Sequence, residues 1–286
     1  LYPDANILVA DKTDFTKQNR ERLFGRIATG DWDAVIVAHS SFKKIDMPRD
    51  VQEEILREQI DAVIEAIEAS KAAEGGRATI KQLEKQREKM EERYNALLAG
   101  TGQKDRAVDF ADLGVDALFI DESHEFKNLA FQTTMNVSGL GNVTGSAKAL
   151  DLFIKCRYLQ RQNNGRGVYF MTGTPISNTI AEVYTLQRYM QYDELKNKDI
   201  EHFDAWASTF GQVTSGWELD ATGVNYKLKS RFAKFQNVPE LLSMYRTFAD
   251  VVTKSDLDEQ AKQAGERSLT PPIEGGKPYN DVVERS

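Results

Sequence analysis

An apolar run that ends in two carboxylates is the strongest chemical signal in the sequence. Residues 117–120 are apolar, and Asp121, Glu122 and His124 follow within four positions. Next to a phosphate-binding loop, the first carboxylate can hold magnesium and the second can orient or deprotonate an attacking water. His124 can sense the nucleotide state and pass it onward. The competing interpretation is a pair of solvated acids at a strand end.

A second apolar run ends in small hydroxyl residues. Residues 168–171 are followed by Thr172, Gly173, Thr174 and Pro175. The glycine permits close backbone approach, and the threonine hydroxyls can bond neighbouring carboxylates or phosphate. A plain strand-to-helix turn, in which both threonines satisfy local backbone groups, also fits this segment. A chance occurrence of both motifs, in this order and on successive strands, is rarer than a chance occurrence of either motif alone.

Four short apolar runs predict the strands that position these motifs: residues 6–10, 34–38, 117–120 and 168–171. Strands of a parallel sheet give continuous apolar runs because helices cover both faces of the sheet. We therefore expect an α/β fold, an open parallel sheet flanked by helices. Ligands bind such sheets at the carboxyl ends of the strands. The runs ending at Ala38, Ile120 and Met171 should share one sheet.

Residues 48–107 interrupt this pattern with two amphipathic stripes on either side of Gly75-Gly76. The stripes predict a helical hairpin inserted between two strands. We expect an arm that projects from the sheet domain and whose deletion leaves the domain folded. A solvated arm with a narrow packing seam is the simpler interpretation, and a partner or DNA contact is the alternative.

Two helix starts carry capping signals. Ser146 precedes a helix expected over residues 147–160. Thr179 and Glu182 form a predicted capping pair for the helix after Pro175.

Composition limits the function classes. The formal charge of −7 argues against global attraction to nucleic acid but leaves room for a local basic stripe. No apolar run approaches the ~18 residues of a membrane helix, and the N-terminus does not resemble a signal peptide. The lone Cys156, expected to be buried, excludes an internal disulfide framework and a cysteine zinc site. We expect a cytoplasmic, bacterial protein.

A locally basic stretch precedes the second motif. It contains Lys155, Arg157 and Arg161. A basic helix can follow a phosphate backbone, so these residues are candidates for nucleic-acid contact. A solvated helix face is the competing interpretation.

The motifs resemble those of a known family. Residues 121–124 resemble motif II, the DEAH box, of superfamily-two helicases, and residues 172–175 resemble motif III. The continuation, residues 176–186, is similar to the Snf-type branch of double-stranded-DNA translocases, and residues 33–42 are loosely similar to motif Ib. The whole segment, with its insertion, is similar to helicase–methylase fusion proteins of phages, plasmids and conjugative elements.

The resemblance implies a RecA-like lobe with ATP and magnesium as cofactors and DNA, in duplex form, as partner. It makes Asp121 the magnesium ligand and Glu122 the catalytic acid/base. The residues that it implies for coupling ATP to DNA are His124, Thr172, Gly173 and Thr174. The residues that it implies for phosphate contact are His39, Ser40 and Ser41.

The resemblance also implies a division of the chain. Residues 1–47 and 108–254 are expected to form two parts of the first ATPase lobe, 48–107 the hairpin insertion and 255–286 an interlobe linker. The phosphate loop G-x-x-x-x-G-K-[ST] does not occur in the 286 residues, so we expect this chain alone not to hydrolyse ATP. A second RecA-like lobe and a methylase domain are expected elsewhere in a larger protein. The alternatives are a strand-separating DEAH-type helicase and a binding scaffold without catalysis.

Overall fold

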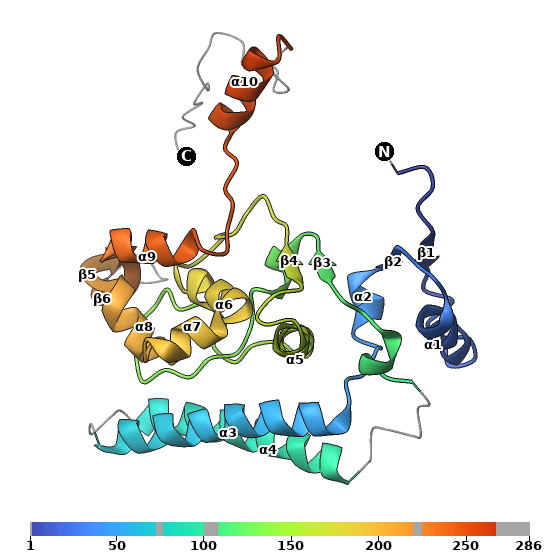
Figure 1. Cartoon of the computed structure of the whole chain (residues 1–286). Helices are drawn as coiled ribbons and strands as arrows, with labels where there is room; N and C mark the ends of the chain where they lie inside the picture. Colours follow the sequence, from blue (N-terminus) through green and yellow to red (C-terminus); the bar gives the residue numbers. More distant parts are fainter. Residues whose placement is uncertain (1, 73–76, 100–107, 220–224, 267–286) are drawn as a thin grey trace, which may run out of the picture. The chain divides into compact units, whose positions relative to one another are not determined.

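The computed structural model describes residues 2–72, 77–99, 108–219 and 225–266 (Figure 1). The chain divides into two compact units, Leu1–Leu241 and Leu242–Ser286. The turn expected at Gly75-Gly76 and the Pro- and Gly-rich residues 271–276 lie outside the described residues.

The N-terminal part is a β-α-β unit. Strand β1 (Ile7–Ala10) pairs in parallel with β2 (Ala34–Val37), and helix α1 (Arg20–Thr29) connects them. A short helix, α2 (His39–Phe42), follows β2 directly. Leucine, phenylalanine and isoleucine side chains on one face of α1 are buried in the core, which fixes the crossover helix on the sheet.

A second β-α-β unit carries the two motifs. Strand β3 (Leu118–Ile120) pairs in parallel with β4 (Val168–Phe170), and α5 (Ala147–Gln162) connects them. The Ser146 hydroxyl accepts a hydrogen bond from Ala149 N, which confirms the predicted cap of α5. Two 3₁₀ helices, η1 (Ala111–Leu113) and η2 (Ser123–Phe126), lie before and after β3 in the chain.

The α/β class is confirmed, but one open sheet is not formed among the described strands. These strands make three separate two-stranded sheets, and β2 has no ladder to β3. The outward side chains of the parallel strands remain exposed, including Val9 at 65% and Phe119 at 64%. Helices therefore cover only one face of each parallel pair in the described part of the chain. Apolar runs identified the strands, whereas pairing depends on distant contacts that such runs do not specify.

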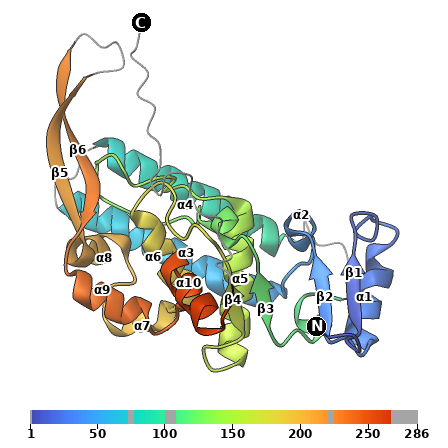
Figure 2. The same ribbon diagram turned by 90° about the horizontal axis from the view of Figure 1, so that it is seen from above.

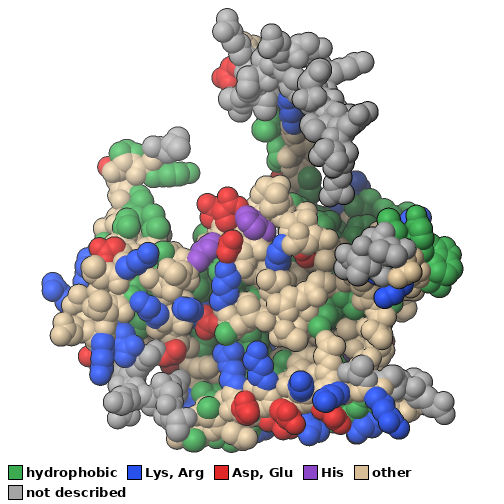
Figure 3. All heavy atoms as spheres, turned by 180° about the vertical axis from the view of Figure 1, so that it is seen from behind, with side chains coloured by type: hydrophobic (Ala, Val, Ile, Leu, Met, Phe, Trp, Pro, Cys, Tyr) green, Lys and Arg blue, Asp and Glu red, His purple; other side chains and the backbone are tan. Residues whose placement is uncertain are grey.

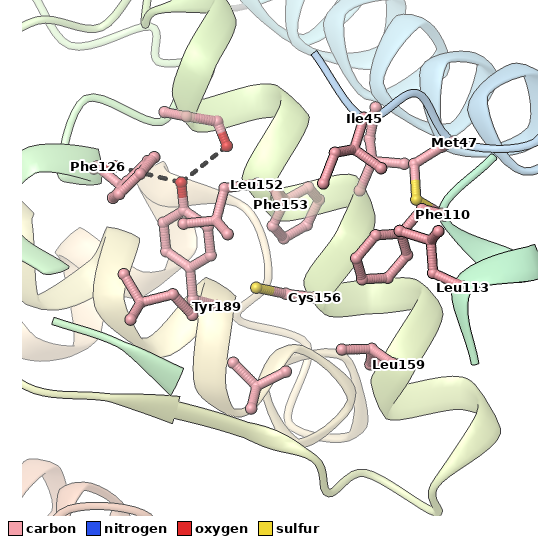
Figure 4. Packing of buried hydrophobic residues seen from close by; sticks show 14 of the residues in the cluster. Ile45, Met47, Phe110, Leu113, Phe126, Leu152, Phe153, Cys156, Leu159 and Tyr189 are labelled. Atoms are coloured by element: carbon pink, nitrogen blue, oxygen red, sulfur yellow. Dashed lines mark hydrogen bonds between the residues drawn. The ribbon is translucent and has the colours of Figure 1, made fainter. Parts of the chain in front are cut away.

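The main core lies between the parallel strands and α5 (Figure 4). Phe153 and Cys156 of α5 are buried there together with Phe126 of η2 and Tyr189 of a later helix. Burial raises the pKa of the Cys156 thiol, which keeps it neutral. Cys156 is thus a small buried residue, as expected.

The inserted hairpin is present as two long helices, α3 (Arg49–Ala72) and α4 (Arg77–Leu98), which lie side by side (Figures 1 and 2). Their mutual seam buries residues from both helices: Ile60, Val63, Ile67, Leu83 and Met90.

The prediction that this arm simply projects is wrong for the first half of α3. Ile55 is fully buried in the main core. Gln59 accepts a hydrogen bond of 2.9 Å from the buried Arg188. Because these contacts join the hairpin to the domain, its removal would expose core side chains and take away the Gln59 acceptor of Arg188.

A helical layer follows β4. It contains α6 (Ala181–Met190), α7 (Tyr192–Asn197) and α8 (Phe203–Phe210). Aromatic rings of α6 and α8 pack against one another, with Tyr184 and Trp206 at a centroid separation of 5.5 Å. This aromatic cluster gives the layer a core of its own.

A long antiparallel hairpin follows α8 and was not predicted. It consists of β5 (Gly211–Leu219) and β6 (Tyr226–Phe235), with an irregularity between Gln212 and Val213. Polar and charged residues alternate with apolar ones along both strands, so no continuous apolar run marks them.

Two further helices complete the description. Helix α9 (Val238–Tyr245) spans the boundary between the units, and α10 (Lys254–Gln263) begins at a capping box formed by Thr253 and Asp256. Helix α10 includes the first residues of the segment expected to be the interlobe linker, 255–286. None of the helices in the described ranges is both long and apolar enough to cross a membrane.

Because Ile55 joins α3 to the main core, Ile55→Ala should lower the free energy of unfolding of the domain by about 2–5 kcal/mol. Ile67→Ala is the matched control, since Ile67 is buried in the hairpin seam instead. Hydrogen exchange should show lost protection in α5 for Ile55→Ala, but only in α3 and α4 for Ile67→Ala. Equal protection of α5 in both variants would show that the arm is independent of the core.

Candidate functional site

The carboxyl ends of β3 and β4 lie together, which confirms the predicted neighbouring of the runs that end at Ile120 and Met171, whereas the run that ends at Ala38 belongs to another sheet. In the parallel register Ile120 stands opposite Phe170. The pairing continues past both strands, because Met171 N donates to Ile120 O at 2.9 Å and Ser123 N donates to Met171 O at 3.0 Å. The polar residues that follow β3 are therefore next to Thr172 (Figures 1 and 2).

Glu122 has an unusual backbone. Its φ of 48° and ψ of 45° lie in the left-handed region, which glutamate seldom occupies. Such a conformation costs about 1–3 kcal/mol and persists only where neighbouring structure enforces it. Here it turns the chain sharply from β3 into η2. The turn leaves both the Asp121 and the Glu122 side chain exposed.

His124 connects the two motifs. Its Nδ1 lies 3.2 Å from Glu122 Oε2 and 3.2 Å from Thr172 Oγ1. Nδ1 is thus within reach of both a carboxylate oxygen and a hydroxyl oxygen. Thr172 Oγ1 in turn accepts a hydrogen bond of 3.1 Å from Thr174 N. Glu122, His124, Thr172 and Thr174 thus form a continuous chain of polar contacts.

The other candidates for coupling occupy simpler positions. Gly173 and Thr174 are exposed in the loop between β4 and α6. A Cβ added at Gly173 would meet open space, so no close backbone approach within the described chain requires glycine there.

A second polar cluster, which the sequence did not reveal, holds the loop after Thr174. Glu182 accepts hydrogen bonds from Ser177 N at 2.6 Å and Asn178 N at 3.2 Å. Lys127, which directly follows η2, lies 3.3 Å from Glu182 and also donates to the Ser177 hydroxyl. Burial acts to raise the pKa of Glu182, but these bonds from Ser177, Asn178 and Lys127 outweigh it and lower the pKa.

Glu182 therefore stays ionised and fixes the loop between β4 and α6 to the segment that follows η2. The predicted capping pair of Thr179 and Glu182 is wrong, because α6 begins at Ala181 and its N-cap, Ile180, has no side-chain bond. The sequence feature that corresponds to this polar cluster is Glu182 in the first turn of α6, preceded by the pair Ser177-Asn178.

A small cavity of about 20 Å³ separates the two clusters. His124, Lys127, Thr172 and Glu182 lie on its polar side, and Tyr189 lies on its apolar side. The space suits about one water molecule and is far too small for a nucleotide. A water there would join the two polar clusters.

The end of β2 also reaches this region. The His39 ring packs edge-on against Phe126 of η2, with centroids 5.0 Å apart. Ser40 is exposed, but Ser41 is buried at 2% exposure. Of the three proposed phosphate contacts, the prediction for Ser41 conflicts with its burial. Acidic and histidine side chains lie next to one another near the middle of the face in Figure 3.

The prediction of an exposed basic helix is wrong for two of its three residues. Lys155 is fully buried and bonds Asp151 at 2.6 Å, while Arg157 is 5% exposed and bonds Asp193 at 2.7 Å. Hydrogen bonding to Arg157 lowers the pKa of Asp193. These cations are neutralised within the fold, so they do not face a phosphate backbone in this structure.

Arg161 remains partly exposed at 34%, but it pairs with Glu54 of the inserted hairpin at 3.0 Å. It thus links α5 to α3. The basic residues Lys155, Arg157 and Arg161 therefore form neither a solvated face of α5 nor a DNA-binding face in this structure.

The comparisons with known proteins agree with motifs of the helicase type. A family model described as "Probable helicase domain" matches residues 1–253. The chain is 23% identical over 237 residues to the "Defense against restriction protein B" of Escherichia phage P1. That alignment covers 82% of this chain and 10% of the phage protein, so the chain spans about a tenth of that relative's length. No solved structure shows significant similarity. The chain belongs to the family of probable helicase domains.

Proposed function

We propose that this chain is part of the first lobe of an ATP-dependent DNA translocase of the Snf-like type, a motor that moves along duplex DNA. The observation that carries the proposal is the shared edge of β3 and β4. There Asp121 and Glu122 lie next to Thr172, with His124 between the two motifs. Membership of the helicase family supports the same reading. The similarity to a phage protein supports a mobile-element setting. A second RecA-like lobe and a methylase domain in the full-length protein are part of the proposal.

Asp121 fits the role of a magnesium ligand. Its exposed carboxylate accepts a bond of 2.9 Å from Glu122 N through Oδ1, which leaves the second oxygen for a hard cation. No group of three or more His, Cys, Asp or Glu that could hold a metal occurs in the described ranges. In the proposal, phosphate oxygens, waters and groups from the missing phosphate loop complete the coordination. Bound with ATP, magnesium neutralises charge on the phosphates.

Glu122 fits the role of the group that orients the attacking water. Its side chain is 62% exposed, and the left-handed backbone holds it at the strand end beside Asp121. The carboxylate can accept a proton from water while it keeps its contact with His124. The two adjacent acids thus divide the work between metal binding and water activation.

His124 and Thr172 fit the role of coupling residues. A change at Glu122 during hydrolysis would alter its contact with His124 Nδ1, and Nδ1 also contacts Thr172 Oγ1. Thr172 Oγ1 holds Thr174 N, at the start of the loop that Glu182 fixes at Ser177. A change in nucleotide state can thereby reach α6 through short polar contacts.

Two alternatives remain distinct from this proposal. A strand-separating DEAH-type helicase would use the same acids but unwind duplexes, which an unwinding assay detects. A binding scaffold would keep the fold without hydrolysis. The 286 residues contain no G-x-x-x-x-G-K-[ST] pattern, so the proposal requires a phosphate loop from another segment of the full-length protein.

In the full-length protein, Glu122→Gln should abolish ATP turnover and leave nucleotide binding largely intact, because the amide keeps the shape but cannot accept the proton. Asp121→Asn should also weaken magnesium-dependent binding, since it removes the charge facing the metal. Steady-state ATPase assays and nucleotide-binding titrations measure the two effects. Wild-type turnover by Glu122→Gln would contradict the assignment and favour the scaffold.

Thr172→Val should leave part of the ATP hydrolysis but reduce its stimulation by duplex DNA, because valine keeps the shape and removes the hydroxyl between His124 and Thr174. Thr29→Val is the matched control, since the Thr29 hydroxyl donates to Gly25 O within α1, outside this chain of contacts. The ratio of DNA-stimulated to basal ATPase measures coupling. An equal loss in both variants would remove the Thr172 hydroxyl from the coupling path.

A further inference from the structure

The β5–β6 hairpin has two chemically different faces. Opposite residues of an antiparallel pair share a face, and successive residues alternate between faces. Trp217 pairs with Leu228, and Leu219 pairs with Tyr226, so these four side chains lie on one face. The other face carries three of the four basic residues of β6, in register with β5 residues of small or acidic type: Lys227, Lys229 and Arg231.

The apolar face is unusually exposed. Trp217 is 70% exposed, Tyr226 66%, Leu228 59% and Leu219 50%. A contiguous exposed patch that contains a tryptophan and a tyrosine is typical of an interaction site, because burying such rings on binding is strongly favourable.

The base of the hairpin, in contrast, is firmly anchored. Phe232 is 3% exposed and packs against Phe203 at 5.6 Å. Its backbone N donates to Ser138 O at 2.8 Å, and Ser138 N donates to Ser230 O at 3.0 Å. A Cβ at Gly139 would lie 2.7 Å from Phe232 O, so glycine permits this close approach. The outer patch therefore projects from a fixed support.

The charge of the hairpin differs from that of the remaining chain. Residues 211–235 contain four Lys or Arg and two Asp or Glu, a net charge of +2 in a chain of −7. The other residues together thus carry −9. A positive, aromatic element on an otherwise acidic protein complements a polyanion with stackable bases.

We propose that the β5–β6 hairpin binds single-stranded nucleic acid. Trp217 and Tyr226 are diagonal neighbours on one face, about 7–8 Å apart, which gives each ring room for one unpaired base. Lys227 and Lys229 have long flexible stems that can reach around the strand edge to the phosphates. Bases in a duplex already stack on one another, so the exposed rings favour unpaired strands. The choice of nucleic acid over protein rests on the proposed function.

The test is binding of labelled 20-nucleotide oligo-dT and oligo-U to the 286-residue chain without ATP, followed by fluorescence anisotropy. Trp217→Ala and Tyr226→Ala should each weaken binding about tenfold, whereas Trp217→Phe should retain most of it. Replacing Lys227 and Lys229 by Ala should reduce the salt slope by about 0.7 for each lost phosphate contact. The dT and U arms distinguish DNA from RNA.

Matched controls are Tyr2→Ala, an exposed tyrosine at 84%, and alanine at Lys85 and Lys89, exposed lysines of α4. These variants should bind like the wild-type chain, and thermal melting should show that all variants are folded. Undetectable binding by the wild-type chain, or unchanged affinity after replacing Trp217 and Tyr226 together, would overturn the proposal. If replacing Trp217 and Tyr226 reduced self-association or protein binding but left the affinity for oligonucleotides unchanged, the proposal would be overturned as well. Because no ATP is present, this outcome is independent of the ATPase test of Glu122.

Discussion

The parallel pairing of β3 with β4 is the constraint on which the candidate site depends. Three residues of each strand pair, and backbone bonds from Met171 and Ser123 extend the pairing beyond them. A shift of one residue would turn the alternating side chains to the opposite face and separate the motifs. The strained backbone of Glu122 then turns the chain so that both acids point outward at the shared edge.

Helix α6 stabilises this edge through contacts with the segments around it. The Tyr189 hydroxyl lies 2.8 Å from Ala149 O and 3.2 Å from Phe126 O, so it joins α6 to α5 and η2 (Figure 4). Arg188 donates to Ala130 O and to Gln59, which brings in the inserted hairpin. Glu182 holds the loop between β4 and α6 through hydrogen bonds from Ser177 and Asn178. Helix α6 therefore connects the loop that follows β4, the segment that follows β3 and the inserted hairpin. A movement of α6 would affect all three.

The sequence predicted local features well and distant pairings only in part. Strands β1 to β4 and the cap at Ser146 follow from contiguous patterns of burial and polarity, and the position of Asp121 beside Thr172 follows from the expected parallel pairing of two of these strands. Burial of Lys155 was missed because a charge pattern does not show where a neutralising partner lies, although Asp151 stands one helical turn earlier. The separate sheets depend on contacts between remote segments. The β5–β6 hairpin is local, and the alternation of Trp217 and Leu219 with polar residues is a strand signal that a search for continuous apolar runs misses.

The most direct test of the account is the location of the metal in the full-length protein bound to ATP. Iron(II) can replace magnesium, and peroxide then cleaves the backbone next to the bound metal. The account predicts cleavage at Asp121 and at the adjacent segment Met171–Thr172, because both lie at the edge formed by β3 and β4. Cleavage that depends on ATP but occurs away from both segments would contradict the claim that this edge is the nucleotide–metal site.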